Sequence, residues 1–169
     1  MYLEIDGVTA ETLSERTVAN IEVLTYAHGV SMPLTFQTGS NTGRTHGRSQ
    51  HQEFTITKYL DLSSPDLNVL CCGGNNIGTV TLRIFQADQH AADAAAVIEY
   101  MTYELNDCII TNVSTSGGGA ARPIETVTFN YNKITWTYTK QKHQAPGGPE
   151  GSASTYWDLN TNQGTTNSA

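Results

Sequence analysis

The stretch IETVTFNYNKITWTYT, residues 124–139, alternates apolar and polar side chains over most of its length. Val127, Phe129 and Tyr131 alternate with threonine and asparagine, and the same alternation continues through residues 134–139. Successive side chains of a β-strand point to opposite faces of the sheet, so a period of two indicates a strand. Each half of the stretch therefore predicts one strand with a core face and a hydroxyl-lined face.

The link between these two strands, residues 131–133, is short enough for a β-hairpin, and Asn132 is a residue type that accepts a positive φ. We therefore expect the two strands to pair with each other. Other segments rich in β-branched and aromatic residues predict strands at residues 2–5, 21–28, 54–60, 79–85, 97–105 and 109–113. Short strands separated by Gly, Asn, Asp and Ser are typical of a β-sandwich or a barrel. The fold class is predicted to be mainly β.

One short helix is predicted in SSPDLNVLCCGG, residues 63–74. Ser64 is a capping residue, Pro65 suits the first helical position, and Gly73 or Gly74 provides the stop. The i, i+3, i+4 spacing forms one apolar face from Leu67, Leu70 and Cys71. A second helix within the alanine-rich residues 87–97 is an alternative to a long hairpin tip there.

Length and composition fit one domain, residues 1–169. Charged residues make up 15% of the chain, where about 25% is typical, and Thr, Asn, Gly and Ser replace them. The net charge is -7 and Lys and Arg do not cluster, so the basic surface that nucleic acids require is missing. We therefore expect no nucleic-acid partner.

The N-terminal sequence has no basic segment followed by an apolar one, as a signal peptide would. No apolar run approaches the roughly 18 residues of a membrane span, so no membrane insertion is expected. Export by a machine that recognises the folded protein would leave neither mark. The sequence therefore does not distinguish a resident cytosolic protein from one exported in this way.

The histidines and cysteines form no catalytic or metal-binding pattern. The spacing of His46 and His51 matches no standard zinc motif, and we interpret both as solvated or interfacial. His28 directly follows a strand and is expected to be packed or hydrogen-bonded. Cys71 and Cys72 lie at a helix C-terminus, which disfavours a thiolate, so we predict buried, reduced thiols. No catalytic residue, cofactor or metal site is predicted, and the protein is not expected to be an enzyme.

Carboxylates and sheet edges point to assembly more than to acid–base chemistry. Glu22, Glu99 and Glu125 lie within or beside strands and are expected to be exposed or paired across strands. The lysines and prolines that usually prevent edge-to-edge pairing are scarce in this threonine-rich chain. Either closure of the sheets or a partner subunit must then cover the edges.

The C-terminal segment, residues 145–169, is rich in Gly, Pro, Ser, Thr and Asn. Tyr156, Trp157 and Leu159 interrupt this polar composition. An isolated aromatic group in a polar tail indicates a docked strand, here followed by a frayed end.

Five stretches carry a resemblance that covers nearly the whole chain. They are YLEIDGV from Tyr2, NIEVLTYAHGVS from Asn20, FTITKYLDLSSPDLNVLCCGG from Phe54, IETVTFNYNKITWTYTKQ from Ile124 and YWDLNTN from Tyr156. In sequence and order they resemble the haemolysin-coregulated proteins, Hcp, the inner-tube subunits of bacterial type VI secretion. The chief departure is residues 87–97, ADQHAADAAAV, which are longer and richer in alanine than the usual hairpin tip.

The resemblance implies a small antiparallel β-barrel of two packed sheets with one short α-helix and a long extended loop. It also implies a homo-hexamer whose rings stack into a hollow tube, tipped by a VgrG spike and driven out of the cell by a contractile sheath. Small effector proteins would travel in the lumen, and position assigns Ala27 and Gly118 to its wall. Such a subunit would assemble in the cytoplasm and then be secreted to the medium or a target cell without a signal peptide.

The loop is MPLTFQTGSNTGRTHGRSQHQ, residues 32–52, and it has few side chains for a core. A structureless loop of about 20 residues is unusual in a compact domain unless it has a function. In a ring-forming subunit it would be an assembly arm that reaches a neighbour in the ring or in the next ring. The residues predicted to make its contacts are Met32, Thr35, Phe36, Arg44, His46 and Arg48. A disordered lid is the alternative for this segment.

Two rival functions remain. A specialised Hcp with toxin activity would carry an extra C-terminal domain, where this sequence has a polar tail. A monomeric β-barrel that binds a small ligand is the other, because threonine-rich faces are compatible with it. The mass of the native particle separates the second rival from a ring.

Overall fold

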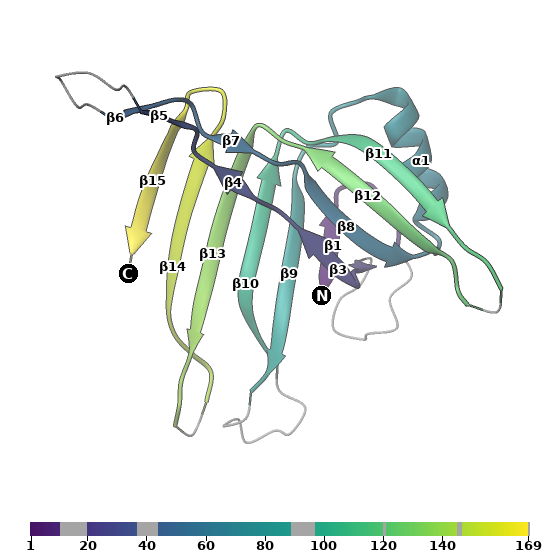
Figure 1. The fold of residues 1–169 in the computed structure, drawn as a ribbon. Coiled ribbons are helices and arrows are strands. Elements are labelled where there is room, and N and C mark those ends of the chain that lie inside the picture. The colour runs from purple at the N-terminus through teal and green to yellow at the C-terminus, as the bar shows by residue number, and fades with distance from the viewer. Residues whose placement is uncertain (11–19, 37–43, 89–96, 120, 145–146, 169) are drawn as a thin grey trace.

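In the computed structural model of the 169-residue chain, the described residues are 1–10, 20–36, 44–88, 97–119, 121–144 and 147–168. For residues 35–36, 44–46 and 166–168 only the backbone is described. Two antiparallel sheets and one helix form the body of the molecule (Figure 1). The mainly β fold that the sequence predicts is confirmed.

The larger sheet has seven strands in the order β15-β14-β13-β10-β9-β1-β2. In chain order their bounds are β1 Tyr2–Ile5, β2 Ile21–Glu22, β9 Val80–Ala87, β10 Val97–Asn106, β13 Lys133–Gln141, β14 Pro149–Asp158 and β15 Gln163–Ser168. The smaller sheet has the order β11-β12-β8-β3, with β3 Thr25–Ala27, β8 Phe54–Tyr59, β11 Ile109–Ser116 and β12 Ile124–Asn130. Through the described strands neither sheet closes on itself, so β15, β2, β11 and β3 are edges. The two packed sheets are confirmed, but they form an open structure.

A single apolar core contains side chains from both sheets. Its fully buried members include Leu3 on β1, Leu82 on β9, Phe54 on β8 and Phe129 on β12. The predicted alternation is confirmed in β12, where Val127 and Phe129 are buried and the intervening threonine is partly exposed. The core therefore lies on the faces that the period-two pattern selects.

The predicted hairpin at residues 131–133 is wrong. β12 pairs with β11 and β8, whereas β13 pairs with β10 and β14, so the chain crosses from one sheet to the other at this link. Tyr131 is buried at the crossing, and the Asn132 amide donates to the carbonyl of Asn106. Among the described non-glycine residues, positive φ occurs at Asp107 and Asn162, and not at Asn132. Local length allowed a hairpin, but burial of Tyr131 between the sheets requires a crossing.

The predicted strand at residues 21–28 is likewise divided between the sheets. β2 pairs with β1 in the larger sheet, and β3 pairs with β8 in the smaller one. At the break, the Val23 amide donates to Met1 while the Leu24 amide donates to Thr57 of the other sheet. The apolar pattern of residues 21–28 is continuous although the two halves join different sheets, because Val23 stays buried where the chain bends.

Helix α1, Ser64–Gly73, confirms the predicted helix and its stop. Gly74 has a φ of 60°, and its amide donates to the carbonyls of Leu70 and Cys71. Leu67 is buried in the core, while Leu70 and Cys71 are partly buried. The helix packs beside β11, at the end of the molecule opposite β15 (Figure 1).

Two predictions about the helix region are wrong. The N-cap residue is Ser63, not Ser64, and its side chain makes no capping bond because both hydroxyls have other partners. Cys72 is exposed, since it lies beyond the apolar face that Leu67 defines, whereas Cys71 is half-buried. The alternative of a second helix falls largely on residues 89–96, outside the described residues.

The polar loop forms a hairpin arm with two short ladders. β4 Val30–Ser31 pairs with β7 Gln50–His51, and β5 Leu34–Phe36 pairs with β6 Arg44–His46. The sequence predicted a long extended loop without strands here, whereas its described part contains paired strands. Pairing satisfies backbone amides and carbonyls that a polar loop would otherwise leave to water.

The predicted docked strand in the C-terminal segment is confirmed as β14, which pairs with β13 along its length. The segment after it is not merely frayed, because β15 adds a further strand through the turn around Asn162. Gly164 lies opposite Trp157, and a Cβ there would lie 2.6 Å from the indole. The glycine therefore lets the Trp157 ring lie against β15.

Candidate functional site

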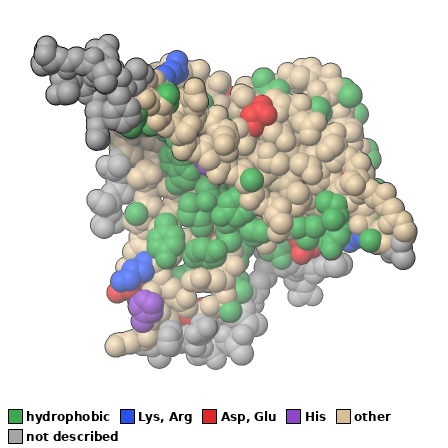
Figure 2. Space-filling view, in the orientation of Figure 1, with side chains coloured by type: hydrophobic (Ala, Val, Ile, Leu, Met, Phe, Trp, Pro, Cys, Tyr) green, Lys and Arg blue, Asp and Glu red, His purple; other side chains and the backbone are tan. Residues whose placement is uncertain are grey.

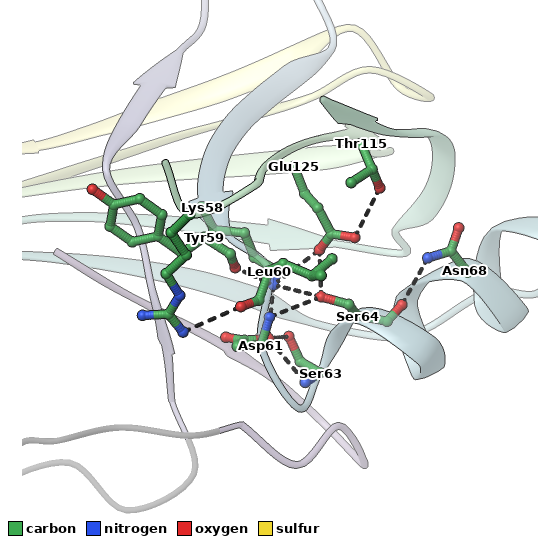
Figure 3. A network of polar contacts seen from close by, with 10 residues as sticks. Lys58, Tyr59, Leu60, Asp61, Ser63, Ser64, Asn68, Thr115 and Glu125 are labelled. Atoms are coloured by element: carbon green, nitrogen blue, oxygen red, sulfur yellow. Dashed lines mark hydrogen bonds and ion pairs between the residues drawn. The ribbon is translucent and has the colours of Figure 1, made fainter. Parts of the chain in front are cut away.

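A buried charge cluster joins the smaller sheet to the start of α1 (Figure 3). The side chains of Lys58 and Glu125 are fully buried, and Lys58 Nζ lies 3.1 Å from Glu125 Oε2. The ammonium also donates to Asp61 Oδ1 at 2.7 Å and to Ser64 Oγ at 3.2 Å. Ser64 Oγ donates to Glu125 Oε2, and Thr115 donates to the other carboxylate oxygen at 3.1 Å. Because each of these side chains is paired and hydrogen-bonded, the free-energy cost of burying it is offset.

The alternation of the strands explains why these charges point inward. Phe54 and Ile56 face the core, and Lys58 is the next residue on that face of β8. Glu125 occupies the same face of β12, where it is the register partner of Lys58. The period-two pattern could therefore have identified both residues, although the sequence alone suggested no role for Lys58. Glu125 was expected to be either exposed or paired across strands, and the structure shows it buried and paired with Lys58.

Asp61 completes the cluster at its outer side. Burial acts to raise the pKa of Asp61, but hydrogen bonds from Lys58 and Ser63 outweigh it and hold this pKa below its ordinary value. The carboxylate accepts from the backbone amide of Ser63 at 2.9 Å and from its hydroxyl at 2.6 Å. These bonds fix the turn between β8 and α1. The turn presents Leu60 and Leu62 to solvent, and Leu62 is 61% exposed.

A second cluster, of aromatic rings, lies at the other end of β8 and β12. It contains His28, His51, Tyr131, Trp136, Trp157, Tyr103, Tyr26 and Phe54. His28 Nε2 lies 2.7 Å from the Tyr131 hydroxyl, and His51 Nδ1 lies 3.4 Å from it. The His51 ring stacks on Trp157 with an interplanar angle of 18°. His28 is thus packed and hydrogen-bonded, as the sequence predicts.

Burial determines the protonation of this aromatic cluster. Burial lowers the pKa of His28, and the nearby His51 lowers it further. Burial also lowers the pKa of His51. The pKa of Tyr131 is raised by burial, so its hydroxyl stays protonated. The aromatic cluster is therefore uncharged near neutral pH, in contrast to the ion-paired cluster around Lys58.

The arm exposes apolar side chains on its described part. Val30, Met32 and Leu34 are each about half exposed, at 51%, 47% and 50%. Arg48 is also exposed. The side chains of the other predicted contact residues, Thr35, Phe36, Arg44 and His46, lie outside the described residues, although their backbones pair in β5 and β6. Exposed apolar side chains in a projecting hairpin are typical of a surface that binds another chain.

The residues predicted for a lumen wall lie apart on the smaller sheet. Ala27 is exposed on edge strand β3, and Gly118 is exposed in the turn after β11. The face that carries Ala27 is lined by hydroxyls, where Thr25 and Thr57 are 2.6 Å apart and Thr55 lies beside Thr128. This threonine face, Thr25, Thr55, Thr57, Thr126 and Thr128, is neutral and confirms the predicted hydroxyl-lined side.

Another apolar surface lies on the larger sheet. Hydrophobic side chains gather over its middle strands, below the arm (Figure 2). Tyr138 is 51% exposed there and contacts Tyr100 edge-on, opposite Met101 on the neighbouring strand. Residues 134, 136 and 138 lie on the same face of β13. This face is buried in the core at Ile134 and exposed to solvent at Tyr138.

No helix in the part of the chain that the structure describes is long and apolar enough to cross a membrane. Within the same residues, no three His, Cys, Asp or Glu side chains are grouped as a metal site requires. The cysteines are free thiols, and burial raises the pKa of Cys108 to about 12. The structure therefore offers exposed apolar surfaces for association with other chains. The charge cluster and the aromatic cluster hold the segments that carry these surfaces in place.

Comparison with known proteins agrees with this structure. Residues 2–138 match the family described as type VI secretion system effector, Hcp. The chain is 32% identical to protein hcp1 of Pseudomonas aeruginosa over 113 residues, which span 66% of this chain and 65% of that relative. It is 28% identical to the major exported protein of Pseudomonas aeruginosa over 158 residues, 81% of this chain and 87% of the relative.

A solved type six secretion system protein has the same fold. The two structures superpose with a TM-score of 0.80 and 28% sequence identity, covering 97% of this chain and 98% of the other. The family match includes both internal clusters except Trp157, since it extends from the first strand into β13. The chain belongs to the Hcp family of type VI secretion system effectors, which are secreted structural proteins and not enzymes.

Proposed function

We propose that this chain is a structural subunit of a type VI secretion inner tube, in which homo-hexameric rings stack and are expelled by sheath contraction. The observation that carries the proposal is the arm. It is a hydrogen-bonded hairpin whose described residues Val30, Met32 and Leu34 are about half exposed. An isolated two-stranded hairpin is marginally stable in water, so contacts with another chain would stabilise this one.

The outer strands of the arm, β5 and β6, lie at the end of the molecule opposite α1 (Figure 1). Near α1, Leu62 and Val69 are 61% and 70% exposed. When two different surfaces of one chain bind each other, copies associate head to tail and form closed rings or filaments. Open sheet edges at β15 and β11 supply further backbone groups for pairing between copies.

The threonine face is the part of the chain proposed to line the lumen. Its hydroxyl groups are neutral, so it would let small effector proteins pass without strong charge attraction. Ala27 lies on this face and Gly118 lies beyond its far end, and both remain predicted lumen positions. A VgrG spike and the contractile sheath would contact the assembled tube, which forms in the cytoplasm before it is secreted.

Native mass and negative-stain images of the purified chain test the ring. A particle of six chains is expected, with rings visible at micromolar concentration. A monomer without rings under these conditions would contradict the proposal and would favour the monomeric ligand-binding protein instead.

Replacement of residues 35–48 by a short Gly/Ser linker tests the arm. Loop length changes closure entropy slowly, by about 0.6 kcal/mol per doubling, so the body should stay folded while stacking and secretion fail. Far-UV circular dichroism and thermal melting of the isolated subunit should change little. Normal stacking and secretion of this variant would make the arm a tolerated surface insertion.

A charge variant with a matched control sharpens the same test. Arg44→Ala with Arg48→Ala should weaken stacking more at low salt than at high salt, because salt screens charge contacts between chains. Lys140→Ala with Lys142→Ala removes the same charge from the end of β13, away from the arm. Equal effects of the two double variants would mean that net charge, and not the arm, governs stacking.

A further inference from the structure

Each of the two chain segments that connect the arm to the sheets carries a histidine where the arm begins. His28 precedes β4 on the outgoing segment, and His51 lies in β7 on the returning segment. The segments are joined by the Val30–His51 register pair and by the Gln52 amide, which donates to the Gly29 carbonyl at 2.9 Å. We call residues 28–31 and 50–52 the arm base.

Both imidazoles of the arm base meet one hydroxyl of the body. Tyr131 Oη lies 2.7 Å from His28 Nε2 and 3.4 Å from His51 Nδ1, and it can donate to the Gln52 carbonyl at 3.3 Å. The two imidazole ring centroids are 6.2 Å apart. Both rings also contact Trp136 on β13, and His51 stacks on Trp157 of β14. The arm base is therefore attached to the larger sheet largely through its two histidines.

The groups that face the two histidines carry no compensating negative charge. The tyrosines among them are Tyr131 and Tyr103 on β10, and burial raises the pKa of Tyr103. Tyr26 on β3 contacts the ring of Tyr103. Phe54, Trp136 and Trp157 supply only rings. Glu53 follows in the chain, but it is exposed and accepts from Asn130. Among the described residues, no carboxylate forms an ion pair with either imidazole.

We propose that the arm base is a pH-operated latch, closed while His28 and His51 are neutral and opened when acidification puts a positive charge on both. Protonation leaves hydrogen bonding possible, because both imidazoles can donate to Tyr131 while its hydroxyl donates to Gln52. Desolvation and repulsion between the two charges instead oppose the doubly protonated closed state. A single charge would be tolerated better, since the indole rings attract a cation.

The direction of the pH effect follows from linkage. Burial lowers the pKa of both histidines in the closed base relative to an open base in water. At pH above the ordinary value of about 6.5, both states are neutral and closure is unaffected by pH. Below that value the open base binds more protons, so closure weakens as pH falls towards the lowered values. One extra proton bound by the open base changes the opening equilibrium about tenfold per pH unit.

The latch concerns the single chain and does not depend on ring formation. Its consequence for assembly does rest on the proposed function, because acid would then release the arm and weaken stacking. If the chain proved to be monomeric, the proposed function would fail while the latch could still be measured.

Tryptophan fluorescence tests the latch directly, since both tryptophans of the chain, Trp136 and Trp157, contact His51. Between pH 7.5 and 4.5 the full chain should show a transition with its midpoint below about 6.5. The double variant His28→Gln with His51→Gln should lose this transition. His143→Gln, which alters an exposed histidine after β13, should keep it. A transition that persists in the double variant, or that is absent from the wild type, overturns the proposal.

Hydrogen exchange separates opening from mere quenching by a protonated imidazole, and it needs no variant. After correction for intrinsic rates, amides of the arm base should lose protection about tenfold per pH unit through the transition, while amides of the β13–β14 ladder keep theirs. Unchanged protection of the arm base across the transition contradicts the latch. Histidine NMR titration with both midpoints at or above about 6.5 contradicts it as well, because the aromatic rings would then favour the charged pair.

Discussion

Strands β8 and β12 run between two polar clusters of opposite design. At one end, Lys58 and Glu125 form a fully buried ion pair. At the other end, where Phe54 pairs with Phe129, the partly buried histidines bind an uncharged tyrosine. The charge cluster holds a fixed turn and the start of α1, whereas the aromatic cluster holds the base of a projecting arm. Fully paired charges are suited to the turn before α1, which must stay in place. Neutral rings that can be protonated are suited to the arm base, which can be released.

The largest effect is expected where one member of the charge pair is removed. Glu125→Ala removes the fully buried carboxylate beside the Lys58 ammonium and leaves Asp61 as the remaining charged partner, so the loss of unfolding free energy should be about 3 kcal/mol, the low end for breaking a buried pair. Urea unfolding measures it. Glu99→Ala is the matched control, because Glu99 pairs across strands with Arg83 in a partly exposed setting, where a pair contributes about 0 to 1 kcal/mol.

If both variants lost the same stability, burial would not be what distinguishes the charge cluster. The double variant Lys58→Met with Glu125→Leu gives a further check. Replacing both charges by apolar groups should recover part of the stability, because the Lys58–Glu125 pair is removed together while Asp61 loses Lys58 but keeps its hydrogen bonds from Ser63. A double variant as unstable as Glu125→Ala would indicate that the hydrogen bonds to Ser64 and Thr115, and not the charges, hold the turn.

A smaller loss is expected at the strand that supports the arm base. In Gly164→Ala the new methyl group would lie 2.4 Å from the Tyr156 carbonyl and 2.6 Å from the Trp157 ring. Overpacking of this kind typically costs about 1 to 3 kcal/mol, and it should also shift the fluorescence of Trp157. Gly151→Ala on β14 is the control, since a Cβ there meets nothing within 4 Å. Similar spectra and stability for both variants would disprove the close approach.

The charge cluster and the aromatic cluster should respond to acid at different pH values. The pKa of Asp61 is lowered in the folded protein, so its stabilising contribution is present above the unfolded value of about 3.8 and disappears as pH falls through the folded value. Asp61→Asn should therefore flatten the dependence of stability on pH below about pH 5. Thermal melts from pH 3 to pH 7 measure this slope. An unchanged slope would exclude Asp61 as its source.

The smallest effect is expected on the surface of α1. Cys72 is exposed, so Cys72→Ser should change the unfolding free energy by less than about 0.5 kcal/mol. Cys71→Ser should cost about 1 kcal/mol, because it places a hydroxyl on the partly buried face. Thiol labelling of the native protein should modify Cys72 first and Cys108 last. Rapid labelling of Cys108 would show that the core opens more easily than its burial implies.

Strand positions, the helix and its stop, and the family resemblance could all be predicted from the chain. These features depend on local patterns: alternation in residues 124–139, the Pro65 and Gly74 boundaries, and motifs that lie close together in sequence. The predicted docking of Tyr156 to Leu159 was confirmed for the same reason, since an aromatic group in a polar segment has to be buried.

Only the tertiary structure decided which sheet each strand joins. The link at residues 131–133 and the break after Glu22 are compatible with a hairpin and a single strand by length, but the chain crosses between sheets at both. The roles of Lys58, Tyr131 and the arm histidines also emerge only there, because their partners are remote: Glu125 is 67 residues from Lys58 and Tyr131 is 103 residues from His28. The local sequence determines the secondary structure and the face of the strand on which each side chain lies. Which strands and side chains pair with each other depends on burying all the apolar faces together, and that is a property of the whole chain.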